Sequence, residues 1–381
     1  MSPRLTPLKG RHLALVLRDL RIGGAERQAI LLAEELAGRG EAQVEVWCFS
    51  GGEGPNRRRL DELGIPVIEM SPGSSANPLH RSLQLIRFLV AARRRNVDLL
   101  IPLTDWPNKV CGALWPLLGA RASVWNQRDE GREITEGLLE RLSLRLSTVF
   151  ACNASSGESF LRERMGVSGH RIVRIRNWVR PEPPQKTPAA WRRELGVPDE
   201  RLLVLMVANL HPFKDHPTLL RAWRLVLDRM EETQPLLLLA GRPQGRRLME
   251  LEALTTELEI GGNIRFLGEI DDLSGLLSTV DLLVHSSRRE GCPNAVLEAM
   301  ASDVPVIATA IPGILEALGP ESSFLVPEGD AEALAGKITQ LLQSPDLLSD
   351  CSTEMQRAFE NYSTPEQALE SYIQLLGSLL A

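Results

Sequence analysis

Short runs of apolar residues, three to seven long, recur along the chain and are separated by polar loops and amphipathic stretches. Most of these runs are rich in Leu, Val and Ile without alternation, which is typical of strands buried on both faces of a parallel sheet. They predict strands at residues 12–17, 44–49, 65–68, 98–103, 123–126, 148–152, 201–207, 235–240, 263–268, 281–284, 305–308 and 324–326.

The stretches between these runs predict helices at residues 27–39, 82–95, 156–165, 294–302 and 365–381. The helix at 82–95 has an apolar side formed by Leu83, Ile86, Leu89 and Val90. Four prolines between Arg180 and Pro188 mark an interdomain linker. Strands alternate with helices on both sides of it, which predicts an α/β protein of two doubly wound, Rossmann-like domains, residues 1–180 and 181–364.

The composition fits an ordinary soluble globular protein, with 43% hydrophobic and 24% charged residues among 381. No apolar run approaches the roughly 20 residues needed to span a bilayer. The polar segment Met1–Gly10 lacks the apolar core of a signal peptide. Five scattered cysteines without metal-site spacing predict reduced thiols. Together these features predict a cytoplasmic protein.

The charge is distributed unequally between the two halves of the chain. Residues 1–180 carry 27 Lys and Arg against 19 Asp and Glu, a net charge of +8, whereas residues 181–381 carry 16 against 30, a net charge of −14. Such an imbalance indicates a charged partner. Because basic and aromatic residues are not interleaved and no recognition motif is present, we do not expect that partner to be nucleic acid.

The stretch from Val280 to Met300 predicts a strand, a polar loop and the start of a helix, with Pro293 in the first helical turn. Backbone N–H groups at a helix start favour phosphate binding. Glu290 in the loop and Glu298 in the helix each offer two acceptor oxygens to vicinal sugar hydroxyls. The pattern favours a ligand with both phosphate and sugar, although two solvated glutamates would give the same sequence.

Two further loops follow predicted strands of the first domain. Gly23 and Gly24 lie between the first strand and its helix, where they would allow either close approach of a phosphate or a plain turn. Asp105 lies just beyond the carboxyl end of strand 98–103, where ligands bind in open α/β sheets.

The run Glu290-Gly-Cys-Pro-Asn-Ala-Val-Leu-Glu298-Ala-Met-Ala resembles the signature of the family-four retaining glycosyltransferases, in which seven residues separate two glutamates. The Gly23-Gly24-Ala-Glu loop and the closing strand and turn at 172–178 are also similar to that family. The resemblance covers nearly the whole chain and is densest between 204 and 330. It implies the GT-B fold, two domains across a cleft and a terminal helix, residues 365–381, that returns to the first domain.

The resemblance also implies a role for individual residues. Glu298 would hold the ribose of a donor nucleotide, Glu290 the transferred sugar, and Lys214 the leaving diphosphate. The residues implied as catalytic are Glu290, Lys214 and Asp105. The residues implied in donor binding are Gly23, Gly24, Asn209, Lys214, Ile270, Glu290, Gly291, Cys292, Pro293, Asn294, Ala295 and Glu298.

The chain departs from the family pattern five residues before Lys214. The family commonly has Gly-Arg-Leu there, whereas this chain has Ala208-Asn209-Leu210 and so lacks one cation. A charge-assisted contact contributes roughly 1.5–3 kcal/mol. Arg242 or the Arg288–Arg289 pair could replace it, and the sequence leaves that choice open.

The function implied is a hexosyltransferase of the retaining type that uses no cofactor and no metal, since neither an Asp-x-Asp pair nor a His/Cys cluster is present. A nucleotide-diphosphate sugar, with UDP or GDP as the nucleotide, would be the donor, and a glycan or a lipid-linked intermediate of cell-surface polysaccharide or glycoconjugate biosynthesis the acceptor. The excess of basic residues in residues 1–180, which includes the triplets 57–59 and 93–95, favours an anionic acceptor and peripheral association with the inner face of an anionic membrane. Arginines at a helix C-terminus also suit the helix dipole, so a soluble acceptor remains as an alternative. A sugar-nucleotide epimerase and a non-catalytic nucleotide-sugar-binding module remain as alternatives.

Overall fold

The computed structural model describes residues 7–51, 54–73, 77–131 and 137–381, so most of the predicted polar segment 1–10 lies outside the described residues. Contacts divide the chain into two compact units. Unit 1 contains Met1–Asn177 together with Pro365–Ala381, and unit 2 contains Trp178–Thr364. Each unit is described separately below.

Unit 1 is built around a seven-stranded parallel sheet with the order β3-β2-β1-β4-β5-β6-β7. Its strands are β1 (His12–Leu17), β2 (Gln43–Cys48), β3 (Val67–Glu69), β4 (Leu99–Pro102), β5 (Ala122–Gln127), β6 (Val149–Cys152) and β7 (Ile172–Arg174). The central strands are buried along their whole length, as their continuous apolar character predicts.

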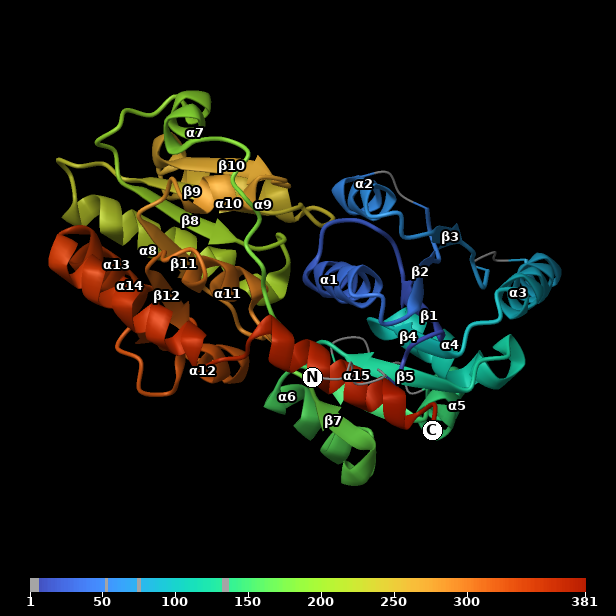
Figure 1. Cartoon of the computed structure of the whole chain (residues 1–381). Coiled ribbons are helices and arrows are strands. Elements are labelled where there is room, and N and C mark those ends of the chain that lie inside the picture. Colours follow the sequence, from blue (N-terminus) through green and yellow to red (C-terminus); the bar gives the residue numbers. More distant parts are fainter. Residues whose placement is uncertain (1–6, 52–53, 74–76, 132–136) are drawn as a thin grey trace. The chain divides into compact units, whose positions relative to one another are not determined.

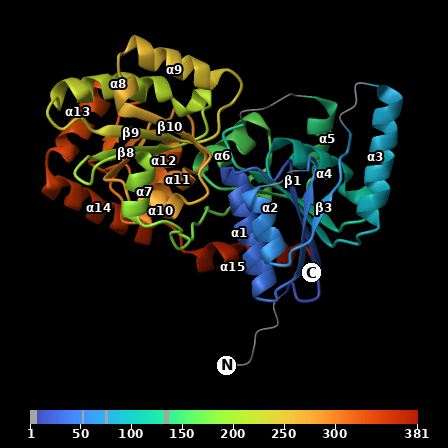
Figure 2. The same ribbon diagram turned by 90° about the horizontal axis from the view of Figure 1, so that it is seen from above.

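The helices of unit 1 flank this sheet (Figures 1 and 2), with α1 beside α2, and α3 and α5 beside α4. They are α1 (Gly24–Gly38), α2 (Pro55–Glu62), α3 (Pro78–Arg93), α4 (Asp105–Leu118), α5 (Leu138–Leu146), α6 (Ser155–Ser159) and α15 (Pro365–Ser378). The predicted helix that ends at Met165 is present as α6 and a π-helical turn, Phe160–Arg164.

Unit 2 is built around a six-stranded parallel sheet with the order β10-β9-β8-β11-β12-β13. Its strands are β8 (Leu203–Val207), β9 (Leu236–Ala240), β10 (Ile264–Gly268), β11 (Leu282–His285), β12 (Val306–Thr309) and β13 (Leu325–Val326). Its helices are α7 (Pro188–Leu195), α8 (His216–Arg229), α9 (Arg247–Glu257), α10 (Leu273–Leu277), α11 (Asn294–Met300), α12 (Pro312–Leu318), α13 (Ala331–Leu342) and α14 (Pro345–Glu360). Figure 2 shows α8, α9 and α13 on one face of the sheet and α14 on the other.

Both sheets are doubly wound, so the prediction of two Rossmann-like α/β folds is confirmed. In unit 1 the order reverses between β1 and β4, and in unit 2 it reverses between β8 and β11. The loops that leave two neighbouring strands at such a point diverge to opposite faces and leave a crevice at the carboxyl edge, where ligands bind in this class of sheet. The loops at these two reversals are therefore the expected positions of ligand-binding residues.

The terminal helix α15 packs within unit 1 although 187 residues of unit 2 precede it in the chain. Tyr372 on α15 donates a hydrogen bond to the side chain of Asn126 at 3.2 Å and accepts one from Arg128 at 2.6 Å. Leu369, Tyr372 and Leu376 are buried. The end of the chain thus completes the core of the first unit.

Among the helices that the structure describes, none combines the length and the apolar character needed to cross a bilayer.

Candidate functional site

The loops after β8 and β11 meet at the switch point of unit 2 and are bonded to each other. Ser287 donates its hydroxyl to the carbonyl of Phe213 at 3.0 Å, and the backbone N–H of Arg288 donates to the same carbonyl at 2.8 Å. The hydroxyl of Ser286 lies 3.3 Å from the carbonyl oxygen of Asp215. Because these contacts cross between segments more than 70 residues apart in the chain, they fix both loops relative to the sheet.

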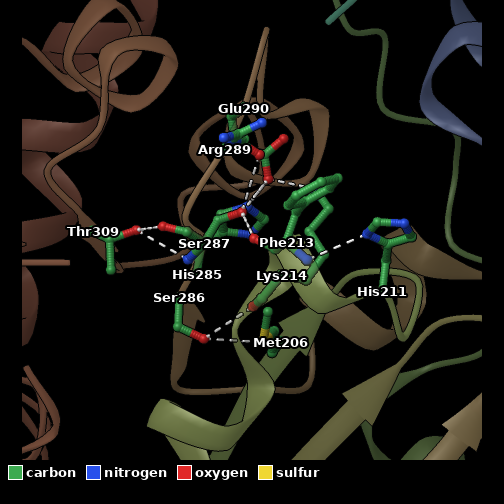
Figure 3. A network of polar contacts seen from close by, with 10 residues as sticks. All are labelled: Met206, His211, Phe213, Lys214, His285, Ser286, Ser287, Arg289, Glu290 and Thr309. Atoms are coloured by element: carbon green, nitrogen blue, oxygen red, sulfur yellow. Dashed lines mark hydrogen bonds and ion pairs between the residues drawn. The ribbon is translucent and has the colours of Figure 1, made fainter. Parts of the chain in front are cut away.

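The carboxylate of Glu290 lies at the centre of this junction (Figure 3). One of its oxygens, Oε1, is bonded to the ammonium group of Lys214, to Nε2 of His285 at 2.8 Å and to the hydroxyl of Ser287 at 2.9 Å. Glu290 is only 4% exposed. Buried charges are stable only when they are paired and hydrogen-bonded in this way.

The surroundings of Glu290 decide its charge. Burial raises the pKa of its carboxyl group, but the positive charge of Lys214 and the hydrogen bond from His285 outweigh burial and lower the pKa well below its usual range. Glu290 is therefore a carboxylate at neutral pH, held in one orientation.

Two further residues hold the backbone that carries Glu290. Thr309, at the end of β12, donates its hydroxyl to the carbonyl of Ser287 at 2.7 Å and accepts from the N–H of Ser287 at 3.0 Å. Gly313, in the first turn of α12, packs so closely that a Cβ atom there would collide with the carbonyl oxygens of Glu290 and Gly291. The loop is thus supported from a third strand and its helix.

Glu298 belongs to α11, which begins with Asn294 directly after the loop. It is 9% exposed, so the reading of Glu298 as a solvated helix-surface charge is wrong. Cys292 has its sulfur 3.2 Å from the hydroxyl of Tyr362. The predicted cradle residues Gly291, Pro293 and Ala295 lie in this same segment.

Asn209, which stands where the family commonly has arginine, has a structural contact of its own. Its side-chain oxygen accepts a hydrogen bond from the backbone N–H of Arg242 at 3.1 Å. The Arg242 guanidinium lies 3.7 Å from the carboxylate of Glu269, just before Ile270, which packs against the core of the unit.

The other basic residues near the junction also have partners. Arg288 is paired with Asp215 at 3.2 Å, and the guanidinium of Arg289 lies 5.2 Å from the centre of the Phe213 ring.

His216, the first residue of α8, is buried. Burial and the positive charges of Arg247 and Lys214 lower the pKa of His216 to about 3, so its imidazole is neutral.

The remaining predicted residues, Gly23, Gly24 and Asp105, belong to unit 1 and follow β1 and β4, which pair at its switch point. A Cβ atom on Gly23 would collide with the carboxylate of Glu26, because that carboxylate folds back over the start of α1. Negative charge is favourable at a helix start, so Glu26 occupies a position in which a phosphate would also be stable.

Asp105 is held by a buried cation. Lys109, one turn further along α4, contacts Asp105 at 2.8 Å and the buried Glu140 at 2.9 Å. Thr104, directly before Asp105, has a φ of 71°, a conformation that β-branched residues rarely adopt. A small pocket lies beside it, lined by polar residues that include Asp105, Asn126 and Glu140 and by the apolar side chains of Trp125, Phe160 and Met165. The positive φ of Thr104 strains the backbone, and such strain is concentrated at functional sites.

The structure thus joins Lys214 directly to Glu290 and places Asn209, Ile270 and Glu298 in the same unit. Sequence reasoning missed the contributions of His285, Ser287 and Thr309. A signal was present for His285, because a histidine at the carboxyl end of an otherwise apolar strand, five residues before a candidate carboxylate, is an unusual choice for a buried position.

Two family models match the chain. Residues 189–361 match "Glycosyl transferases group 1", and residues 22–183 match "Glycosyltransferase Family 4". The first match includes both loops of the unit 2 switch point, and the second includes Gly23, Gly24 and Asp105.

Individual proteins are similar over part of the chain. D-inositol 3-phosphate glycosyltransferase of Corynebacterium urealyticum is 29% identical over 48% of this chain and 45% of its own length. The lipopolysaccharide core biosynthesis glycosyltransferase LpsE of Rhizobium meliloti is 31% identical over 35% of this chain and 40% of its own length. The chain therefore spans less than half the length of these relatives.

Solved structures resemble the whole chain. HepE of Anabaena in complex with UDP and glucose superposes with a TM-score of 0.82 over 96% of this chain and 99% of its own, at 19% identity. WaaG, a glycosyltransferase involved in lipopolysaccharide biosynthesis, has a TM-score of 0.70 over 94% and 98% at 18% identity. At these identities the likeness establishes the fold.

Proposed function

The chain belongs to the family-four glycosyltransferases, the glycosyl transferases of group 1, and from this we propose that it transfers a sugar from a nucleotide-diphosphate sugar to a hydroxyl acceptor with retention of configuration. UDP is the expected nucleotide, because HepE, which shares the fold, has been solved with UDP and with UDP-glucose. GDP is the second choice.

The contact between Lys214 and Glu290 is the observation that carries this proposal. A nucleotide diphosphate bound at the switch point would bring its phosphate oxygens to Lys214, which would then face two anions. Glu290 would lie beside the sugar as its anomeric carbon loses the diphosphate oxygen and gains positive charge. A fixed, dehydrated carboxylate stabilises such a charge because no reorganisation is needed during the reaction.

The transfer can be written with every bond accounted for. The bond between the anomeric carbon and the diphosphate oxygen breaks, and its electron pair leaves with the diphosphate. An acceptor hydroxyl forms the new bond on the same face, and its proton passes to the departing phosphate oxygen. Lys214 stabilises the growing negative charge, so we propose that the reaction needs neither a metal ion nor a cofactor. Glu298 would hold the ribose hydroxyls, and Asp105 would contribute from unit 1.

The proposed acceptor is a glycan or a lipid-linked intermediate. Support comes from the names of relatives that act in lipopolysaccharide core biosynthesis, and from the net charge of +8 over residues 1–180, which suits an anionic acceptor or membrane. We assign acceptor binding to unit 1 and donor binding to unit 2, and we place the reaction in the cytoplasm at the inner face of the membrane.

A panel of UDP-, GDP- and ADP-sugars, each supplied with and without EDTA, tests the proposal. Slow donor hydrolysis, or transfer to a hydroxyl acceptor, that persists in EDTA is the expected result. Activity lost in EDTA and restored by Mg²⁺ or Mn²⁺ would contradict metal independence. Epimerisation of the donor at C2 would identify an epimerase, and tight donor binding without any turnover would identify a binding module.

A further inference from the structure

Helix α3 presents a row of large apolar side chains outward. Leu79, Leu83, Ile86 and Val90 are 78%, 56%, 56% and 46% exposed. Their spacing of four, three and four residues places them within one narrow arc of the helix. Isolated exposed apolar residues are common, but four aligned along one helix form a contiguous patch that indicates an interaction surface.

The opposite side of α3 already packs against unit 1. Phe88 and Ala92 are buried in the core of that unit, with Leu85 and Leu89 packed against it. Phe88 contacts Phe49 edge to face, with ring centres 5.8 Å apart. The inner side therefore fixes the helix, and the four outward residues lie outside this core. The predicted apolar side is therefore divided: Leu83, Ile86 and Val90 face outward, whereas Leu89 packs against the core.

Basic residues border the outward row. Arg87 and Arg94 lie along one side of it and Arg93 along the other, and Pro78–Arg93 contains no acidic residue. Arg93 donates to the carbonyl of Leu117 at 3.2 Å, and Leu117, at the end of α4, is itself 57% exposed. An apolar stripe with arginines on both borders is the pattern of a helix that lies in a membrane interface.

The basic residues indicate which partner binds this surface, a second copy of the chain or an anionic lipid membrane. A second copy of the chain would bring one acid-free, arginine-bordered face against another, which places like charges together. An anionic lipid surface complements both features at once. We propose that α3 is the membrane-docking element of the protein, with Leu79, Leu83, Ile86 and Val90 among the acyl chains and Arg87 and Arg94 at anionic headgroups. This proposal rests on the proposed transfer to a lipid-linked or membrane-proximal acceptor.

The sequence contains two arginine triplets, residues 57–59 and 93–95, and three of these six arginines are paired with carboxylates of unit 1. Arg95 is bonded through Nε to the buried carboxylate of Glu45 at 3.2 Å, and Arg59 is paired with Glu34 at 3.1 Å. Arg57 is paired with Asp61 at 3.1 Å. A variant without Arg95 would leave Glu45 without its guanidinium partner, so an informative charge variant changes Arg87 and Arg94 instead.

Flotation of the purified full chain with vesicles tests the proposal. Wild type is expected to float with vesicles of phosphatidylcholine containing phosphatidylglycerol, and to float less as salt rises or when phosphatidylglycerol is omitted. The variant Leu83→Ser/Ile86→Ser should partition at least tenfold more weakly. The variant Arg87→Ser/Arg94→Ser should lose about fivefold per arginine on anionic vesicles only. Matched controls in unit 2, Met249→Ser on the exposed side of α9 and Arg193→Ser on α7, should behave as wild type.

Donor hydrolysis in solution separates this proposal from the proposed function. Both α3 variants should hydrolyse the donor at the wild-type rate, since neither changes a residue of the switch-point loops. Failure of wild type to bind anionic vesicles, or equal binding by the Leu83→Ser/Ile86→Ser variant, would overturn the docking role even if hydrolysis is normal. Self-association of wild type that this variant abolishes would assign the surface to a second copy of the chain instead.

Insertion can also be measured directly with Leu83→Trp. Because the chain contains seven tryptophans, the signal is the difference between this variant and wild type. A blue shift of that difference spectrum on anionic vesicles, and its quenching by lipids brominated in the acyl chain, are expected if α3 enters the interface. An unchanged spectrum with vesicles present would contradict insertion.

Discussion

Nε2 of His285 lies 2.8 Å from Oε1 of Glu290, across the four-residue turn that follows β11. The imidazole is 1% exposed, and its other nitrogen, Nδ1, has no hydrogen-bond partner among the described residues. The hydrogen-bond partner of the ring is therefore the carboxylate of Glu290, which we assign to the transferred sugar. Because the strand fixes His285 and the loop fixes Glu290, this contact sets the direction in which the carboxylate points.

Replacing His285 by leucine should lower turnover about tenfold and leave affinity for UDP within a factor of two. The physical reason is that the orientation of Glu290 is proposed to matter for the transition state, whereas we assign nucleotide binding to Glu298 and Lys214. Steady-state kinetics and calorimetry measure the two effects. His285→Gln, which keeps an N–H donor, should recover part of the turnover. A leucine variant with normal turnover would show that His285 only fills space.

Lys214→Ala should weaken donor binding and turnover together, and it should also destabilise unit 2 by about 3–5 kcal/mol, because it leaves the buried Glu290 charge unpaired. The double variant Lys214→Ala/Glu290→Gln separates these effects. It should regain most of the free energy of unfolding, measured by urea denaturation, while activity stays lost. Recovery of activity in the double variant would show that Lys214 acts only by neutralising Glu290.

Glu298→Ala should weaken binding of UDP by roughly tenfold or more, since each lost charge-assisted hydrogen bond to a ribose hydroxyl contributes about 1.5–3 kcal/mol. Glu257→Ala, on the exposed side of α9, is the matched control and should bind UDP as wild type does. Calorimetry with the free nucleotide gives both values. Equal affinities for the two variants would remove Glu298 from the nucleotide site.

Asp272 joins the segment before α7 to α10. Its carboxylate accepts hydrogen bonds from the backbone N–H groups of Gln185, Lys186 and Gly275 and from the indole of Trp191, all between 2.9 and 3.0 Å. Burial raises the pKa of Asp272, but these donors outweigh burial and lower it. Asp272→Asn should therefore destabilise unit 2 by about 3 kcal/mol at neutral pH.

The same contacts predict a pH dependence for wild type. Because the pKa of Asp272 is lower in the folded state, its stabilising effect is fully present above the unfolded value of about 3.9 and is lost as the pH falls below it. Urea denaturation between pH 7 and pH 3 should show a smaller loss on acidification for Asp272→Asn than for wild type. Asp199→Asn, at an exposed position, should follow wild type throughout.

The sequence predicts the framework of this protein well. Strands such as Leu203–Val207 and Leu236–Ala240 are continuous apolar runs of five residues, which suit a buried parallel strand and are too short for a buried helix, so length and composition identify them. The loops that carry Lys214 and Glu290 are then placed by topology, since loops after neighbouring parallel strands meet at one edge. The family signature adds the expected roles.

Contacts between side chains distant in the chain are harder to predict. Nothing local indicates that Arg95 meets Glu45 fifty residues earlier, or that Thr309 holds the backbone of Ser287. Helix α3 shows a second difficulty. It has apolar residues on two sides, and periodicity cannot tell which side the sheet covers until the packing of Phe88 is known.

Helix α15 has a consequence for the order in which the protein matures on the ribosome. Unit 2 is one continuous segment, so it has every residue it needs before α15 is synthesised. Unit 1 emerges first but lacks Tyr372, whose hydroxyl contacts Asn126 and Arg128 beside the small pocket. Domains usually mature in the order in which they are translated. Here the segment made first is finished last, because Asn126 and Arg128 gain their hydrogen bonds to Tyr372 only after translation reaches α15.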